Sequence, residues 1–259
     1  MEINTKNLGV GDQGTALHCA AQNGQEAVIR QLLGAGVDIE ARDSKQGTAL
    51  HRAAENGCEA VIRLLLGAGA DLEARDRYQW TALHRAVDQG RETVIDQLLG
   101  AGANLEARDK NHWTPLHRAA SQGRGMIVQC LLEAGAELEA QTEDRRTPVH
   151  VAVAGGREAV VRLLLGAGAI PEACDQDQLT YLHLAARKGR EMVVQCLLDG
   201  NANMEAQDEN QRTPLHWAAD RGHEPAVRRL LSSGANLEAN SNNNETPLHL
   251  AAKNGHVAV

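Results

Sequence analysis

The sequence predicts an all-α fold, an αα solenoid of helix-turn-helix repeats connected by protruding, hairpin-like loops. A threonine followed three residues later by a histidine returns every 33 residues, without insertion or deletion. The threonines are Thr15, Thr48, Thr81, Thr114, Thr147, Thr180, Thr213 and Thr246. A period of this length is typical of stacked units that contact only their neighbours. The composition agrees: because the chain has no Phe and 2% aromatic residues, small side chains with Leu and Val must fill the core.

Each unit is predicted to open with a short helix, as the copy that begins at Thr114 illustrates. Thr114 is a natural N-cap, and Pro115 follows at the first helical position, where its missing N–H costs nothing. One face of this helix carries the apolar residues Leu116, Ala119 and Ala120. We expect Gly123 to end the helix in a left-handed conformation.

A second helix is predicted to follow in each copy. Its apolar stripe in the fourth copy consists of Ile127, Val128, Leu131 and Leu132. Gly135 ends this helix, and the sixth copy has Asn201 at the same position. Asn tolerates positive φ best after Gly, so this substitution supports a left-handed turn. The polar residues 105–113 that come next are predicted to carry the chain to the following unit as a hairpin-like loop.

This unit of short helix, longer helix and loop, opened by Thr114-Pro115-Leu116-His117, resembles the ankyrin repeat. The resemblance extends from Thr15 to the C-terminus. It implies a concave face of hairpin tips and first helices that usually binds protein partners, and it implies no catalysis. We expect a capping segment (1–10) and a repeat domain (11–259) with repeats 11–43, 44–76, 77–109, 110–142, 143–175, 176–208, 209–241 and 242–259. Because the last repeat is incomplete, we expect the chain to be a fragment of a longer protein.

Two positions depart from the pattern of the ankyrin repeat. Where that family usually has Gly, two residues before the threonine, this chain has Gln13, Gln46, Gln79, His112, Arg145, Gln178, Gln211 and Asn244. We therefore expect the hairpin tips to be strained or to use another type of turn. The loop Asn of the family is replaced by Glu40, Glu73, Glu106, Glu139, Glu172, Glu205 and Glu238. Contacts that depend on that Asn therefore do not carry over from the resemblance.

The charge and the cysteines restrict the class of protein. The net charge is −8, and positive side chains alternate with Asp and Glu in every repeat, whereas duplex nucleic acid requires a basic face. The five cysteines include no Cys-x-x-Cys pair, which favours a reducing compartment, either the cytoplasm or the nucleus. The first residues contain no apolar signal region, and the leucine runs are too short to span a membrane.

The regularly spaced histidines are predicted to be structural. They are His18, His51, His84, His117, His150, His183, His216 and His249. Successive units stack at roughly 10 Å, whereas a metal ion needs its ligand nitrogens at about 2 Å. We expect each His to bond to nearby backbone and so connect one hairpin to the next. Because Thr and His recur in every copy, they belong to the scaffold, and we expect no catalytic residue, no metal, no cofactor and no enzymatic activity.

Tryptophans and arginines distinguish copies two to four from the rest. Trp80 and Trp113 immediately precede the threonine, and Tyr78 lies two residues before Trp80. Trp, Tyr and Arg are the usual anchors of protein interfaces. The predicted partner-binding site consists of Arg52, Arg77, Tyr78, Trp80, Arg85, Asp88, Lys110, His112, Trp113 and Arg118. The alternative is that the rings merely pack on neighbouring hairpins and that the arginines are solvated charges.

We therefore predict a non-catalytic scaffold for protein–protein interactions, or the recognition arm of a larger protein, that binds a partner segment in the concave groove. The segment should be partly acidic and should carry an apolar anchor. One alternative is a nucleic acid or a phosphorylated ligand, bound by the patch of Arg52, Arg85, Arg118, Trp80 and Trp113. A second alternative is an intramolecular regulatory arm of a larger enzyme or receptor.

Overall fold

The computed structural model describes residues 15–259, which contain fifteen α-helices and one isolated β-bridge, between Cys174 and Thr180. The expected capping segment (1–10) and the tip residue Gln13 lie outside the described residues. The all-α class is confirmed. Within residues 15–259, every helix is too short or too polar to cross a bilayer. The chain divides into two compact units. The first consists of Met1–Ala119 and Gln129–Glu137, and the second consists of Ala120–Val128 and Leu138–Val259.

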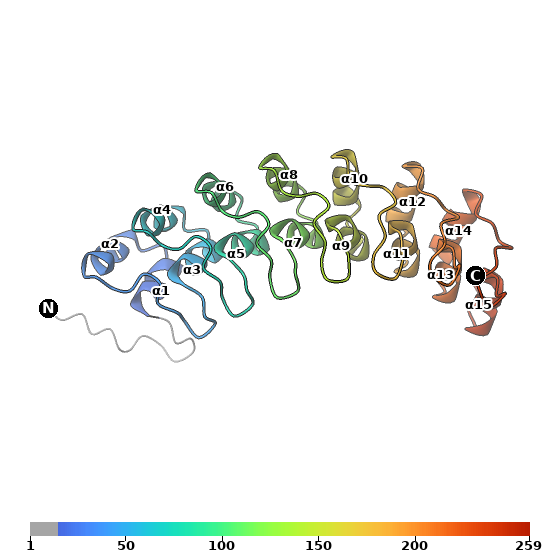
Figure 1. Cartoon of the computed structure of the whole chain (residues 1–259), viewed down its shortest axis with the longest axis horizontal. Helices are drawn as coiled ribbons and strands as arrows, with labels where there is room; N and C mark the ends of the chain where they lie inside the picture. Colours follow the sequence, from blue (N-terminus) through green and yellow to red (C-terminus); the bar gives the residue numbers. More distant parts are fainter. Residues whose placement is uncertain (1–14) are drawn as a thin grey trace. The chain divides into compact units, whose positions relative to one another are not determined.

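The first unit is built from helix pairs. Its helices are α1 (Ala16–Gln22), α2 (Glu26–Gly34), α3 (Ala49–Asn56), α4 (Glu59–Gly67), α5 (Ala82–Gln89) and α6 (Glu92–Gly100). The first helices α1, α3 and α5 pack on one another in order, and the second helices α2, α4 and α6 form a parallel row, as Figure 1 shows. Two helices, α7 (Pro115–Gln122) and α8 (Gly125–Glu133), contribute residues to both units.

The second unit has the same internal arrangement. Its helices are α9 (Pro148–Gly155), α10 (Glu158–Gly166), α11 (Tyr181–Arg187), α12 (Glu191–Asp199), α13 (Pro214–Asp220), α14 (Glu224–Ser232) and α15 (Pro247–Lys253). Here α9, α11, α13 and α15 form one row and α10, α12 and α14 the other (Figure 1). Aliphatic side chains fill the core of each unit, for example Leu83 in the first and Leu182 in the second. The predicted stack of helix-turn-helix repeats is confirmed in both units.

Each first helix begins at the predicted threonine N-cap, and the histidine completes the cap. The backbone N–H of Thr81 donates to Nδ1 of His84 at 3.3 Å, and the Thr81 hydroxyl lies 3.0 Å from the same nitrogen. This is a capping box in which His takes the place that Glu or Gln usually holds. The bond satisfies a backbone donor at the helix start and orients the imidazole ring.

The other imidazole nitrogen connects one copy to the next for His18, His51, His84, His183 and His216, as predicted. The prediction is wrong for His150, whose buried Nε2 has no hydrogen-bond partner among the described residues. Nε2 of His84 lies 3.3 Å from the carbonyl oxygen of Trp113. In the second unit, Nε2 of His183 lies 3.0 Å from the carbonyl oxygen of Arg212. Because Nδ1 accepts from the threonine, Nε2 carries the proton and donates it. Burial lowers the pKa of His84 to about 4, so this ring is neutral at physiological pH.

The turns after the second helices and the hairpin tips adopt positive φ. Gly135 has a φ of 94°, and its counterpart Asn201 has a φ of 60°, as predicted. At the tips, φ lies between 55° and 61° for the non-glycine residues Gln46, Gln79, His112, Arg145, Gln178, Gln211 and Asn244. A side chain in this conformation costs on the order of 1 kcal/mol. The expected strain of the tips is therefore confirmed.

The loop glutamates form a further set of contacts between copies. In the first unit, Oε1 of Glu73 accepts the backbone N–H of Asn104 at 2.8 Å. In the second unit, Oε1 of Glu172 accepts the backbone N–H of Asn203 at 3.0 Å. Each such bond joins one loop to the corresponding loop of the next copy. These glutamates therefore have a structural role in this chain.

Candidate partner-binding surface

The predicted site lies in the first unit, where three hairpins each contribute one buried aspartate. Asp43, Asp76 and Asp109 have only 3%, 2% and 4% of their surface exposed. Oδ1 of Asp76 accepts the backbone N–H groups of Tyr78 and Trp80, at 2.7 Å and 3.0 Å. These two bonds close the hairpin around the tip. The carboxylate thereby holds a strained turn in place.

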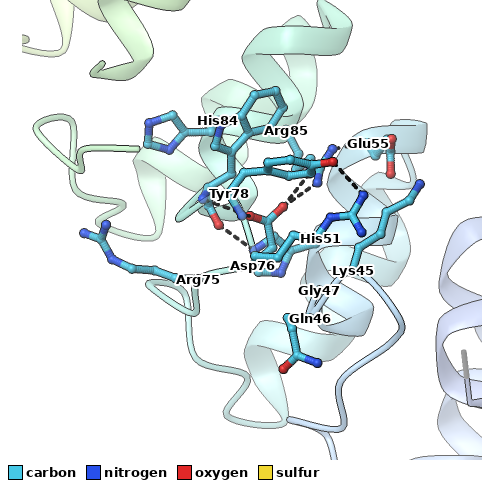
Figure 2. A network of polar contacts seen from close by, with 12 residues as sticks. Lys45, Gln46, Gly47, His51, Glu55, Arg75, Asp76, Tyr78, His84 and Arg85 are labelled. Atoms are coloured by element: carbon cyan, nitrogen blue, oxygen red, sulfur yellow. Dashed lines mark hydrogen bonds and ion pairs between the residues drawn. The ribbon is translucent and has the colours of Figure 1, made fainter. Parts of the chain in front are cut away.

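Each of these aspartates also pairs with an arginine on the first helix that follows. The pairs are Asp43–Arg52, Asp76–Arg85 and Asp109–Arg118. Arg85 donates to Oδ2 of Asp76 through both Nε and Nη2, with Nε at 3.1 Å, and Figure 2 shows the two groups facing one another. The arginine side chains are 10%, 12% and 16% exposed, so solvent shields these ion pairs little.

Two acids on the first helices bring additional negative charge to the arginines. Glu55 lies 3.4 Å from Arg52 and 3.9 Å from Arg85. Asp88 lies 3.4 Å from Arg118. Carboxylates from two different segments therefore surround each guanidinium. These arginines hold hairpins to helices, and their positive charge is neutralised within the unit.

The indole of Trp80 lies between two of these guanidinium groups. Its ring centroid is 4.6 Å from Cζ of Arg85 and 4.1 Å from Cζ of Arg118, which is cation–π range. Its N–H donates to Oδ2 of Asp109 at 3.2 Å. Trp113 lies 5.5 Å from Arg118. Both rings are partly exposed, so they line the surface as well as connecting its hairpins.

Tyr78 forms the centre of a more accessible region. The centroid of its ring is 4.7 Å from Cζ of Arg77, 5.4 Å from Nζ of Lys110 and 5.8 Å from Cζ of Arg85. Arg77 also donates to the Tyr78 hydroxyl at 2.6 Å. Arg77, Lys110 and His112 are exposed, whereas Tyr78 is half-buried. This region therefore combines accessible positive charge with an aromatic face.

The structure brings most of the predicted residues together in the third and fourth copies. Arg52 lies one copy earlier, is 8% exposed, and is linked to the others through Glu55. The third tryptophan of the chain, Trp217, is half-buried in the second unit.

Comparison with known proteins agrees with this architecture. The family model described as ankyrin repeats in three copies matches four overlapping ranges of the chain. These are residues 2–76, 74–142, 126–208 and 182–259. The chain belongs to the ankyrin repeat family. The crystal structure of the human ASB11 ankyrin repeat domain is similar, with a TM-score of 0.74 and 27% identity over 86% of this chain and 99% of that chain. No curated protein sequence matches the chain. Ankyrin repeats are general modules for protein–protein interaction, and the fold is typically non-catalytic.

Sequence reasoning missed the buried aspartates of these ankyrin repeats, although a signal for them was present. An aspartate accompanies an arginine nine residues later in copies two to four. Neutral and apolar residues replace both members at Thr142–Val151 and Ser241–Leu250, whereas Asp175 is kept while Leu184 stands at the arginine position. Asp175 is buried, and Nε of Arg146 lies 3.5 Å from its Oδ2. A buried charge is costly once its partner is lost, so each aspartate that is kept without this arginine has another partner. In the seventh copy, Asp208 keeps a donor partner, since it accepts the indole N–H of Trp217 at 2.9 Å.

The histidines, cysteines and acidic residues of the described repeats bear on metal binding and on thiol reactivity. Within residues 15–259, no group of three His, Cys, Asp or Glu side chains is arranged to hold a metal ion. Burial, together with the nearby Asp96, raises the pKa of Cys130 to about 12. Burial also raises the pKa of Cys58 and Cys196. Since the thiolate is the nucleophilic form, these shifts favour the less nucleophilic protonated thiol.

Proposed function

We propose that this ankyrin repeat chain is a protein-interaction module whose first unit binds a partly acidic partner segment that carries an apolar anchor. The observation that carries the proposal is the surface around Tyr78, where the exposed cations of Arg77 and Lys110 flank a half-buried ring. A carboxylate of the partner pairs with these cations while its apolar side chain packs on the ring. Charge accelerates the encounter, and the aromatic contact holds the complex.

The buried ion pairs support the proposal because they fix the surface in advance. Arg85 and Arg118 both lie within cation–π range of the Trp80 ring, and each arginine is paired with its own carboxylate. A surface that is already ordered loses little side-chain entropy when a partner binds. The other residues of the proposed site are Arg52, Asp88, His112 and Trp113.

A nucleic acid or a phosphorylated ligand fits the same surface less well. The guanidinium groups of Arg52, Arg85 and Arg118 already face carboxylates, so a phosphate must displace an internal ion pair to reach them. A titration with single-stranded oligonucleotides at low salt separates the two functions. Our proposal expects no binding, whereas binding that collapses as salt is added would favour the nucleic acid.

Affinity capture followed by mass spectrometry tests the proposed function. The test variant combines Tyr78→Ala with Lys110→Glu, which alters the accessible groups and leaves the Asp76–Arg85 pair intact. We expect it to lose the proteins that the original chain captures. Arg228→Glu is the matched control, because Arg228 is an exposed cation on α14 of the second unit. Capture that is unchanged in the test variant, with folding verified by circular dichroism, would refute this placement of the site.

A further inference from the structure

A second cation–aromatic arrangement lies in the second unit, and its charges differ from those of the first. The ring of Trp217 lies 5.4 Å from Cζ of Arg187 and 5.4 Å from Cζ of Arg212. Trp80 likewise has two guanidinium neighbours in the first unit, but those arginines pair with buried aspartates. In the second unit the buried Asp208 bonds to the indole N–H of Trp217 instead.

The two arginines beside Trp217 lack a carboxylate partner among residues 15–259. Neither Arg187 nor Arg212 lies within 4.0 Å of an acidic oxygen in that part of the chain, and Nε of Arg212 is buried without a hydrogen-bond acceptor. Burial lowers the pKa of Arg187; the positive charge of Arg221 acts in the same direction, and Asp175 opposes it. Asp175 and Asp177 act on Arg187 only from beyond ion-pair distance. A partly buried cation without a direct ion pair is costly, so an external anion would be stabilised beside it.

Arg187 also lines two clefts. The first, of about 270 Å³, is lined by Arg187, Lys188 and Arg221. The second, of about 170 Å³, places Arg187 and Trp217 together with the acidic side chains of Asp177, Asp208 and Glu209. Sites for drug-sized molecules are usually about 300–1,000 Å³, so these clefts suit single side chains.

Stabilisation of helix C-termini does not by itself explain the cluster of Arg187, Lys188 and Arg221. Lys188 and Arg221 are the C-cap residues of α11 and α13, where positive charge stabilises the helix itself. A solvent-exposed side chain is sufficient for that effect. Arg187, however, is half-buried against Trp217.

We propose that the second unit binds a mixed-charge peptide segment of another protein at this cluster. The carboxylate of a Glu or Asp side chain pairs with Arg187 in the cleft beside Lys188 and Arg221. A Lys or Arg close to it in the peptide pairs with Asp177 and Glu209, which are exposed on the neighbouring hairpins. A nucleic acid is disfavoured, because its regularly spaced phosphates would also meet these two carboxylates. The site shares no residue with the surface proposed in the first unit, so either can fail without the other.

Selection of a random peptide library displayed on phage against the intact chain tests this inference. We expect the enriched peptides to share an acidic residue with a basic residue close by. Synthetic copies of these peptides should bind to the chain. Arg187→Gln should weaken their binding by roughly tenfold or more, the range for a lost hydrogen bond to a charged group. Combining Asp177→Asn with Glu209→Gln should abolish the preference for the basic residue and retain the preference for the acidic one.

Two further variants make the result decisive. Arg228→Gln removes an exposed cation from the same unit and should leave the affinity unchanged. If Arg187→Gln does not fold, Arg187→Lys serves instead. Lysine keeps the positive charge and lacks the planar guanidinium group, so the loss of affinity should be smaller than the one expected for Arg187→Gln. The inference is overturned if the selected peptides share no acidic residue, or if variants of Arg187 bind them normally. Peptides that bind only when phosphorylated, or tighter binding of a single-stranded oligonucleotide, would also overturn it.

Discussion

The two units share one scaffold and differ in how their arginines are used. In the first unit, the arginines of the first helices are paired as Asp43–Arg52, Asp76–Arg85 and Asp109–Arg118. In the second unit, the same helix positions hold Val151, Leu184 and Trp217. The guanidinium groups of Arg187 and Arg212 have no carboxylate partner in the part of the chain that the structure describes. The arginines at this helix position therefore stabilise the first unit, whereas we propose that Arg187 of the second unit takes part in recognition.

The hairpin tips differ in charge as well. In the first unit they carry Lys45, Arg77 and Lys110. In the second unit they carry both signs of charge, with Glu143, Asp144, Asp177 and Glu209 beside Arg145, Arg146 and Arg212. Residues that recur in every copy build the stack, and these copy-specific residues give each unit its own charge pattern. Because complementary charge steers association, the two units should prefer segments of different charge.

The largest expected effect tests whether the carboxylates of the first unit are structural. Asp76→Ala leaves Arg85 without its buried counter-charge and two hairpin N–H groups without an acceptor, so the free energy of unfolding should fall by about 3–5 kcal/mol. Asp208→Ala is the counterpart in the second unit, where the partner is a neutral indole, and should cost about 1–3 kcal/mol. Urea unfolding followed by circular dichroism measures both losses. Equal losses would remove the distinction between the units.

Lowering the pH tests the buried histidines, which are the part of the scaffold that the two units share. Burial lowers the pKa of His84 in the first unit and of His150 in the second to about 4, whereas an unfolded chain has the ordinary value of 6.5. Between these values the unfolded state binds more protons, so stability is complete above pH 6.5 and falls as the pH approaches 4. We expect a loss on the order of 2 kcal/mol per such histidine between pH 7 and pH 5. Urea midpoints across this range check the sign, and a midpoint that rises in acid would contradict it.

Exchanging a charged pair for a neutral one sharpens the comparison. Asp76→Thr combined with Arg85→Val gives this pair of positions the residues that Thr142 and Val151 provide two repeats later. A buried ion pair can often be replaced by apolar groups with little change, so we expect the double variant to lie within about 1 kcal/mol of the original chain. Asp76→Thr alone should be much less stable. A double-mutant cycle in urea measures the coupling, and additive losses would show that the pair is not a unit.

The smallest expected effect concerns the strained tips, which occur in both units. Gln79→Gly and Gln211→Gly place glycine where φ is 61° and 56°. Each should raise the free energy of unfolding by up to about 1 kcal/mol, since glycine adopts this conformation without steric cost. Thermal and urea unfolding measure the gain. A loss of stability in either variant would mean that the tip side chain contributes more through its contacts than it costs in strain.

The fold could be predicted from the sequence because the repeat presents every local signal many times. Thr114 at the helix start, Gly123 at its end and Asn201 in a turn act through neighbouring atoms alone, so their roles can be recognised without a structure. The burial of Asp76 could not be recognised in this way. Taken alone it is a polar loop residue, and it becomes a buried counter-ion only where the hairpin meets Arg85.

The candidate site was predictable in its location and not in its electrostatics. Trp80 and Tyr78 stood out because aromatic residues are rare in this chain. The arginines beside them were interpreted as a positive patch, since the sequence does not show that hairpins and helices from different copies bring carboxylates to each one. The same limit concealed Arg187, because the sequence does not show that it lies beside Trp217 with no carboxylate of the described repeats within ion-pair distance.

Equilibrium unfolding of Arg85→Gln and Arg187→Gln, in the same buffer, compares the two units most directly. Each variant removes one guanidinium from beside a tryptophan. We predict that Arg85→Gln loses about 3 kcal/mol or more, because it leaves Asp76 buried and unpaired. Arg187→Gln should remain within about 0.5 kcal/mol of the original chain, because no internal ion pair is broken. If Arg187→Gln proves as destabilising as Arg85→Gln, the division between structural and available arginines is wrong.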